Sequence, residues 1–88
     1  MKIKKGFTVR NIAGSDIVVP VGNAEKIFNG MITLNESGAF FWNALFKDTT
    51  VDEVVKKVTS EYDVDEERAK ADVEKFIEQL RENNLIEE

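Results

Sequence analysis

The residue types that carry out most enzyme chemistry are missing from this sequence of 88 residues. It contains no cysteine and no histidine, so the common nucleophile and the common general base at neutral pH are absent. Ser15, Ser37 and Ser60 carry hydroxyls, but each stands beside an expected turn or helix start, where serine commonly bonds the backbone. None of the five glycines belongs to a phosphate-binding loop motif. We therefore predict that the chain is not an enzyme.

One acidic stretch has the residue types of a calcium-binding loop. Asp63-Val64-Asp65-Glu66-Glu67 offers closely spaced carboxylates, and Glu74 matches the last ligand position of an EF-hand loop that starts at Asp63. Arg68 stands where such a loop needs glycine, and the intervening residues favour a helix. Acidic residues at a helix N-terminus are stabilised by the helix dipole without any metal. We predict no metal site and no cofactor.

Length and composition describe one small domain. Hydrophobic residues make up 42% and charged residues 33% of the chain, a balance typical of globular rather than disordered proteins. The longest apolar runs, residues 17–21 and 38–42, are far shorter than the roughly 20 residues of a transmembrane helix. The first residues are charged and have no signal-peptide pattern behind them. We expect residues 1–88 to form a single cytoplasmic domain with no membrane segment.

The first third of the chain has the pattern of β-strands. Residues 7–12 partly alternate between apolar and polar, residues 13–16 are typical of a turn, and residues 17–21 are rich in β-branched side chains. A third extended segment is expected from residue 27 or 28 to Leu34. Gly30 falls inside this segment, which indicates a bulge or a close approach by another backbone.

The remaining residues have the periodicity of three helices. Asn35 is expected to cap the first helix, Thr50 and Glu53 form a capping box before the second, and Asp65 is expected to cap the third. The third helix should end at about Glu82. Its apolar stripe consists of Ala69, Val73, Phe76, Ile77 and Leu80. Three strands followed by three helices predict an α+β fold, with the helices on one side of a three-stranded antiparallel sheet.

The same order of elements describes a winged helix-turn-helix, which makes DNA binding one alternative. Residues 1–34 carry five basic and two acidic side chains, whereas residues 35–88 carry seven basic and fifteen acidic ones. The helices are therefore acidic, and at a pI of about 4.8 repulsion from DNA phosphates outweighs the few basic contacts. We expect no nucleic-acid partner, and a winged-helix transcriptional module stays as the alternative.

An uncharged segment points to a different function. Asn29-Gly30-Met31-Ile32-Thr33-Leu34 contains no charged residue and no proline, the types with which proteins usually protect an exposed sheet edge. An unpaired edge of this kind can accept an extended peptide as a further strand. The edge can also be covered by the chain's own elements or by a second copy of the protein. Peptide binding and a homo-oligomer therefore both remain open at this point.

The run Ile32-Thr33-Leu34-Asn35-Glu36-Ser37-Gly38-Ala39-Phe40-Phe41-Trp42 resembles the L-N-[ED]-[TS]-[GA]-x-x-[IFL]-W signature of the PqqD-like family, the RiPP recognition elements. Thr50-Val51-Asp52-Glu53-Val54 resembles the start of that family's second helix. Its third helix is matched by Glu61-Tyr62-Asp63-Val64-Asp65 and by Ala71-Asp72-Val73 with Phe76. The resemblance covers roughly residues 7–86. One departure is that Phe40 precedes the expected aromatic, so three aromatic residues follow one another.

The resemblance implies a winged-helix-like domain that binds the leader segment of a ribosomally synthesised precursor peptide. In this family the leader adds as a strand to the third β-strand and lies against the third helix. The domain then presents the peptide to a modifying enzyme, in many pathways a radical SAM protein. The expected partners are therefore a precursor peptide and a peptide-modifying enzyme, and the chain itself is expected to be a monomer or a homodimer.

Carried onto this sequence, the resemblance assigns the third strand to residues 29–34 and the facing helix to residues 65–82. Helical periodicity places Ile77 at one margin of the buried stripe, with Lys70, Glu74 and Arg81 beyond it. Ile77 is expected to form an apolar pocket, and Lys70 and Arg81 to pair with acidic leader residues. The alternatives are an ordinary core position for Ile77 and solvated positions for the two cations. The candidate peptide-binding residues are Asn29, Gly30, Met31, Ile32, Thr33, Leu34, Lys70, Glu74, Ile77 and Arg81.

Overall fold

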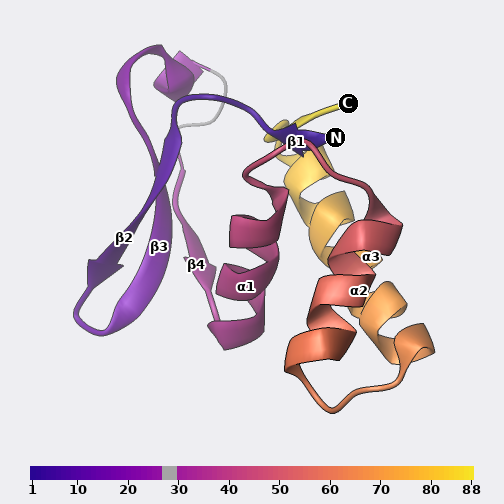
Figure 1. The fold of residues 1–88 in the computed structure, drawn as a ribbon. Helices are drawn as coiled ribbons and strands as arrows, with labels where there is room; N and C mark the ends of the chain where they lie inside the picture. Colours follow the sequence, from indigo (N-terminus) through magenta and orange to yellow (C-terminus); the bar gives the residue numbers. More distant parts are fainter. Residues whose placement is uncertain (27–29) are drawn as a thin grey trace.

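The chain folds into a three-stranded antiparallel sheet followed by three helices (Figure 1). The structure, a computed structural model, describes residues 1–26 and 30–88. In spatial order the sheet consists of β2 (Phe7–Ile12), β3 (Ser15–Pro20) and β4 (Ile32–Leu34). The helices are α1 (Glu36–Leu45), α2 (Val51–Glu61) and α3 (Glu66–Glu82), and a short 3-10 helix, η1 (Gly22–Lys26), follows β3. The expected α+β fold is confirmed.

Helix α1 lies between the sheet on one side and the pair α2 and α3 on the other (Figure 1). Phe41, Trp42 and Leu45 of this helix are buried. Val18 and Leu34 reach the same core from the sheet. Complete burial of an apolar side chain of this size contributes roughly 1.5–3 kcal/mol. The sheet and the outer helices are therefore held together largely through α1.

A two-residue turn fixes the register of β2 and β3. Ala13 and Gly14 have positive φ angles of 54° and 85°, the combination found in a type I′ turn, whose twist matches that of the strands. Ile12 pairs with Ser15 directly across this turn. The turn is shorter than the predicted residues 13–16, because Ser15 and Asp16 already belong to β3.

Strand β4 is shorter than the sequence predicts. Its pairing with β3 covers only Ile32–Leu34. Gly30 and Met31 lie outside the strand, and Asn29 lies outside the described residues. If the register were extended toward the N-terminus of β4, Gly30 would face Pro20, which has no N–H to donate. Of the described residues in the predicted segment, therefore, only the last three form a strand.

The three predicted helix caps are confirmed. Asn35, Thr50 and Asp65 each accept a hydrogen bond from the backbone N–H three residues later, over 2.7, 3.2 and 2.8 Å. The capping box at Thr50 is only half formed. The Glu53 carboxylate accepts a hydrogen bond from the hydroxyl of Thr49, at 3.3 Å, instead of bonding the Thr50 backbone. Thr49 is buried, so this bond satisfies a hydroxyl that has little access to water.

A second, two-stranded sheet joins the chain ends and was not predicted. β1 (Lys2–Ile3) pairs antiparallel with β5 (Ile86–Glu87). The backbone N–H of Lys4 extends the pairing by donating to the carbonyl of Leu85, at 2.8 Å. Ile3, Leu85 and Ile86 are buried. Strands of two residues are too short to produce a recognisable hydrophobic period, which is why the sequence pattern did not reveal them.

Candidate functional site

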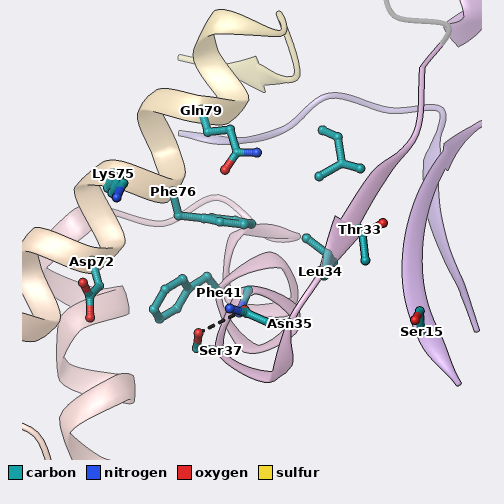
Figure 2. Close-up of a pocket in the computed structure, with 12 residues that line it drawn as sticks. Ser15, Thr33, Leu34, Asn35, Ser37, Phe41, Asp72, Lys75, Phe76 and Gln79 are labelled. Carbon is teal, nitrogen blue, oxygen red and sulfur yellow. Dashed lines mark hydrogen bonds between the residues drawn. The ribbon is translucent and has the colours of Figure 1, made fainter.

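A groove of about 630 Å³ lies between β4 and α3, with the first half of α1 beneath it (Figure 2). Clefts of roughly this size hold small ligands. The lining comes from all three elements and from the start of β3. The lining residues are Ser15, Ile32, Thr33, Leu34, Asn35, Ser37, Gly38, Phe41, Asp72, Lys75, Phe76 and Gln79.

The floor of the groove is apolar. Phe41 of α1 and Phe76 of α3 meet edge to face, with ring centroids 5.5 Å apart. Phe41 is buried, whereas Phe76 is half-buried and presents part of its ring to the groove. Gly38 leaves space at the floor of the groove. A methyl group there would lie 3.6 Å from both Leu34 and Phe76 and 3.0 Å from the Asn35 side-chain oxygen. The floor therefore offers apolar surface with room above it.

The hydrogen-bond direction in β3 follows from the turn at Ala13 and Gly14. In a two-residue hairpin the flanking residues, Ile12 and Ser15, form a hydrogen-bonded pair, and alternate residues repeat that pattern. The backbone groups of Ser15 and Ile17 therefore point toward β2. The N–H of Val21 confirms the alternation, since it donates to Gly6, just before β2, at 2.7 Å. The intervening residues of β3 consequently direct their backbone groups toward β4.

This alternation leaves the backbone of Thr33 without a partner in the sheet. Leu34 lies opposite Asp16 and Ile32 lies opposite Val18, and these two pairs bond across the ladder. Thr33, opposite Ile17, directs its N–H and C=O away from β3. In the part of the chain that the structure describes, β4 is the last strand of the sheet and no strand pairs with this edge. Thr33 therefore offers one donor and one acceptor to the groove.

The wall that faces β4 is formed by one margin of α3. Asp72, Lys75 and Gln79 are exposed there, and Phe76 lies between them. Their side chains make no hydrogen bond or ion pair with any described residue. Figure 2 shows Phe76 and Gln79 pointing from α3 toward the gap beside β4. The groove thus combines a backbone edge, an apolar floor and a polar helical wall.

Some of the peptide-binding residues predicted from the sequence line the groove, and others lie elsewhere. Ile32, Thr33 and Leu34 line the groove. Gly30 is half-buried and Met31 is 70% exposed, and neither is part of the lining. Asn29 falls outside the described residues.

The four candidates on α3 do not line the groove. Ile77 is 2% exposed and belongs to the core. Lys70 and Glu74 are exposed outside the lining. Arg81 is bound to the carboxylates of Glu88 and Glu78, which raise its pKa above the usual value. In the structure the wall facing β4 is therefore formed by the opposite margin of the same stripe.

The reason for this difference between the expected and the observed groove wall is geometric. A helical stripe has two margins, and at about 100° per residue the sequence defines both equally well. Which margin faces β4 depends on how α3 packs on α1, through the contact between Phe76 and Phe41. One feature of the sequence points to the margin that faces β4. Phe76, an aromatic residue, lies at that edge of the apolar stripe and is flanked there by Asp72 and Gln79.

Other kinds of site are not found in the described residues. Residues 1–26 and 30–88 contain no group of three or more acidic, histidine or cysteine side chains placed to hold a metal ion. Among the helices that the structure describes, none combines the length and the apolar character that a bilayer crossing requires.

Two solved structures share the fold. TbiB1, in complex with the TbiA(β) leader peptide, has a TM-score of 0.78 and 22% sequence identity, over 99% of this chain and 95% of that chain. A lasso peptide synthetase B1 complexed with its leader peptide has a TM-score of 0.73 and 19% identity, over 96% and 93% of the two chains. No curated protein sequence matches the chain. Residues 17–86 match the family of coenzyme PQQ synthesis protein D, and with most of its length inside that match, the chain belongs to the PqqD family.

Proposed function

We propose that this chain is a RiPP recognition element that binds the leader segment of a ribosomally synthesised precursor peptide by strand addition to β4. The observation that carries the proposal is the outward-facing backbone of Thr33 at the rim of an apolar groove. Backbone bonds to such an edge supply affinity for any extended peptide, and pockets beside it select the side chains. That the two similar structures each hold a leader peptide supports the same assignment.

Because side chains alternate between the two faces of a strand, the groove predicts which peptide positions are polar and which are apolar. The peptide residue opposite Thr33 directs its side chain to the outer face, because Thr33 itself is exposed there. The residues before and after it direct their side chains to the other face, onto Phe41 and Phe76. We therefore expect the leader to carry two apolar residues separated by one polar residue.

The bound peptide is proposed to pass to a separate modifying enzyme. The chain has neither cysteine nor histidine, and the groove offers a binding surface rather than a nucleophile with a base beside it. A radical SAM enzyme is the proposed partner, and the cytoplasm, where precursor peptides are synthesised, is the proposed location. The role of this chain is then to hold the leader while the partner acts on the following residues.

A titration with a synthetic leader tests the binding step. Isotope-labelled protein is mixed with the leader of the precursor peptide encoded beside its gene, and the backbone amide shifts are followed by NMR. Shifts centred on Ile32–Leu34 and on the Asp72–Gln79 side of α3 are expected, with none for a peptide of scrambled order. Saturable shifts confined to other surfaces would contradict the proposal. Salt-dependent binding of duplex DNA in place of the peptide would favour a winged-helix module.

A homodimer through β4 would use the same backbone groups. If two copies pair at this edge, the shifts of Thr33 depend on protein concentration before any peptide is added. Sedimentation at several concentrations separates this case from a monomer with a free edge.

A further inference from the structure

A peptide that adds to β4 has two backbone edges, and only one of them faces β4. Successive residues of a strand direct their backbone groups to opposite sides, so every second residue directs its N–H and C=O toward the β4 edge, and one of them lies opposite Thr33. The other residues direct theirs across the groove. Because β4 and α3 form the opposite walls, this second edge faces α3. Polar backbone groups buried there without partners would weaken binding.

The facing margin of α3 carries polar side chains suited to these groups. Gln79 presents a carbonyl and an amide, so it can accept from a peptide N–H and donate to a peptide C=O, as a neighbouring strand does. Lys75, one turn earlier, can only donate. Both side chains are exposed, line the groove and make no hydrogen bond with any described residue. Figure 2 shows the Gln79 side chain directed into the gap toward β4.

The spacing of these side chains matches that of a strand. A helix rises about 1.5 Å per residue, which separates Lys75 and Gln79 by roughly 6 Å along the axis of α3. Successive backbone groups on one edge of a strand are about 6.6 Å apart. The two spacings are close enough for two consecutive outward-facing groups of the peptide to bond these two residues.

We propose that Gln79, assisted by Lys75, hydrogen-bonds the second backbone edge of the bound peptide, so that α3 replaces the strand that would otherwise complete the sheet. This rests on the proposed strand addition at β4. The consequence is a sequence requirement on the leader. Proline and other N-substituted residues are excluded at the position that faces Gln79, and not only at the position that faces Thr33.

Single amide-to-ester replacements along the leader test this arrangement. Each ester removes one N–H without changing the side chain, and the probes are the all-amide leader encoded beside the gene and its single-ester forms. Strand addition alone predicts weaker binding at the one position whose N–H bonds the Thr33 carbonyl. The proposed arrangement predicts a loss of about threefold to tenfold at that position and also at a second position, whose N–H faces Gln79, since one backbone bond is lost each time.

The variant Gln79→Leu tests whether Gln79 is the residue that bonds the second backbone edge of the peptide. In this variant the ester at the position facing Gln79 should cost less than about twofold, while the ester at the position facing Thr33 keeps its full effect. Glu78→Leu is the control, because it adds the same apolar group on a side of α3 that does not line the groove, and it should leave all ester effects unchanged. Thermal unfolding verifies that both variants fold.

Two results would overturn the inference while leaving the proposed function intact. One is an ester penalty confined to the position that faces Thr33. The other is an ester penalty of equal size in the wild type and in Gln79→Leu. Failure of the all-amide leader to bind at all would instead contradict strand addition itself, and with it the role of Gln79.

Discussion

Thr33 and Ile17 lie opposite each other in the β3–β4 ladder, yet their backbone groups point in opposite directions. Ile17 bonds to β2, as the turn at Ala13 and Gly14 requires, and Thr33 is left facing the groove. The free edge of this sheet is thus set by a two-residue turn at the far end of the neighbouring hairpin.

Replacing Thr33 with proline should weaken leader binding without unfolding the protein. Proline removes the outward N–H, which no bond within the sheet uses, and an edge strand tolerates it at such a position. We expect roughly tenfold weaker binding, because a peptide carbonyl loses its donor. Thr33→Val is the matched control, since it keeps the N–H. Isothermal titration of both variants measures the difference, and equal affinities would contradict strand addition at Thr33.

Charge reversal on the two margins of α3 distinguishes which one faces the peptide. Lys75→Glu and Lys70→Glu change the net charge equally, but only Lys75 lines the groove. We expect Lys75→Glu to change leader affinity by about threefold or more and Lys70→Glu by less than twofold at moderate salt. The measurement is peptide titration by fluorescence anisotropy. A larger effect at Lys70 would contradict this assignment, and would mean that the peptide lies against the other margin of α3, which the sequence pattern indicated.

Truncation of Ile77 should affect stability rather than recognition. Its side chain is 2% exposed, so Ile77→Ala leaves a cavity in the core. Such substitutions lower the free energy of unfolding by about 2–5 kcal/mol. Urea denaturation measures this loss, and leader affinity at low temperature, where the variant is folded, should stay within about twofold. A large loss of affinity in the fully folded variant would assign Ile77 to the peptide site instead.

Gly38 and Asn35 should show coupled effects on stability. Alanine at position 38 favours the helix by about 0.5–1 kcal/mol, but its methyl group would lie 3.0 Å from the Asn35 oxygen that caps α1. We expect Gly38→Ala to be nearly neutral in the wild type. In an Asn35→Ala background, itself destabilised by about 1 kcal/mol, the same change should be stabilising. Thermal unfolding of the four proteins provides the test, and equal effects in both backgrounds would contradict it.

The local features of the fold could be predicted from the sequence, because each depends on neighbouring residues. The caps at Asn35, Thr50 and Asp65 and the order of strands and helices are of this kind. The features that the sequence did not reveal depend on distant residues. Pairing of Ile3 with Ile86 joins the two chain ends, and the early end of the β4 ladder depends on Pro20 in another strand.

The same distinction applies to the site. The uncharged edge strand was recognisable, because the absence of charge and proline around Thr33 is a local property. The helical wall was not, because the packing of Phe76 on Phe41 decides which side of α3 faces the groove. Gln79 therefore enters the site only once the helices are assembled.

Hydrogen exchange of the Thr33 amide tests strand addition most directly. In the free protein this amide should exchange quickly, while those of Ile32 and Leu34, which bond to β3, should be protected. Saturation with the leader peptide should slow exchange at Thr33 by at least about tenfold, because its N–H then donates to the added strand. An unchanged, rapid exchange at Thr33 in the saturated complex would contradict the proposed mode of binding.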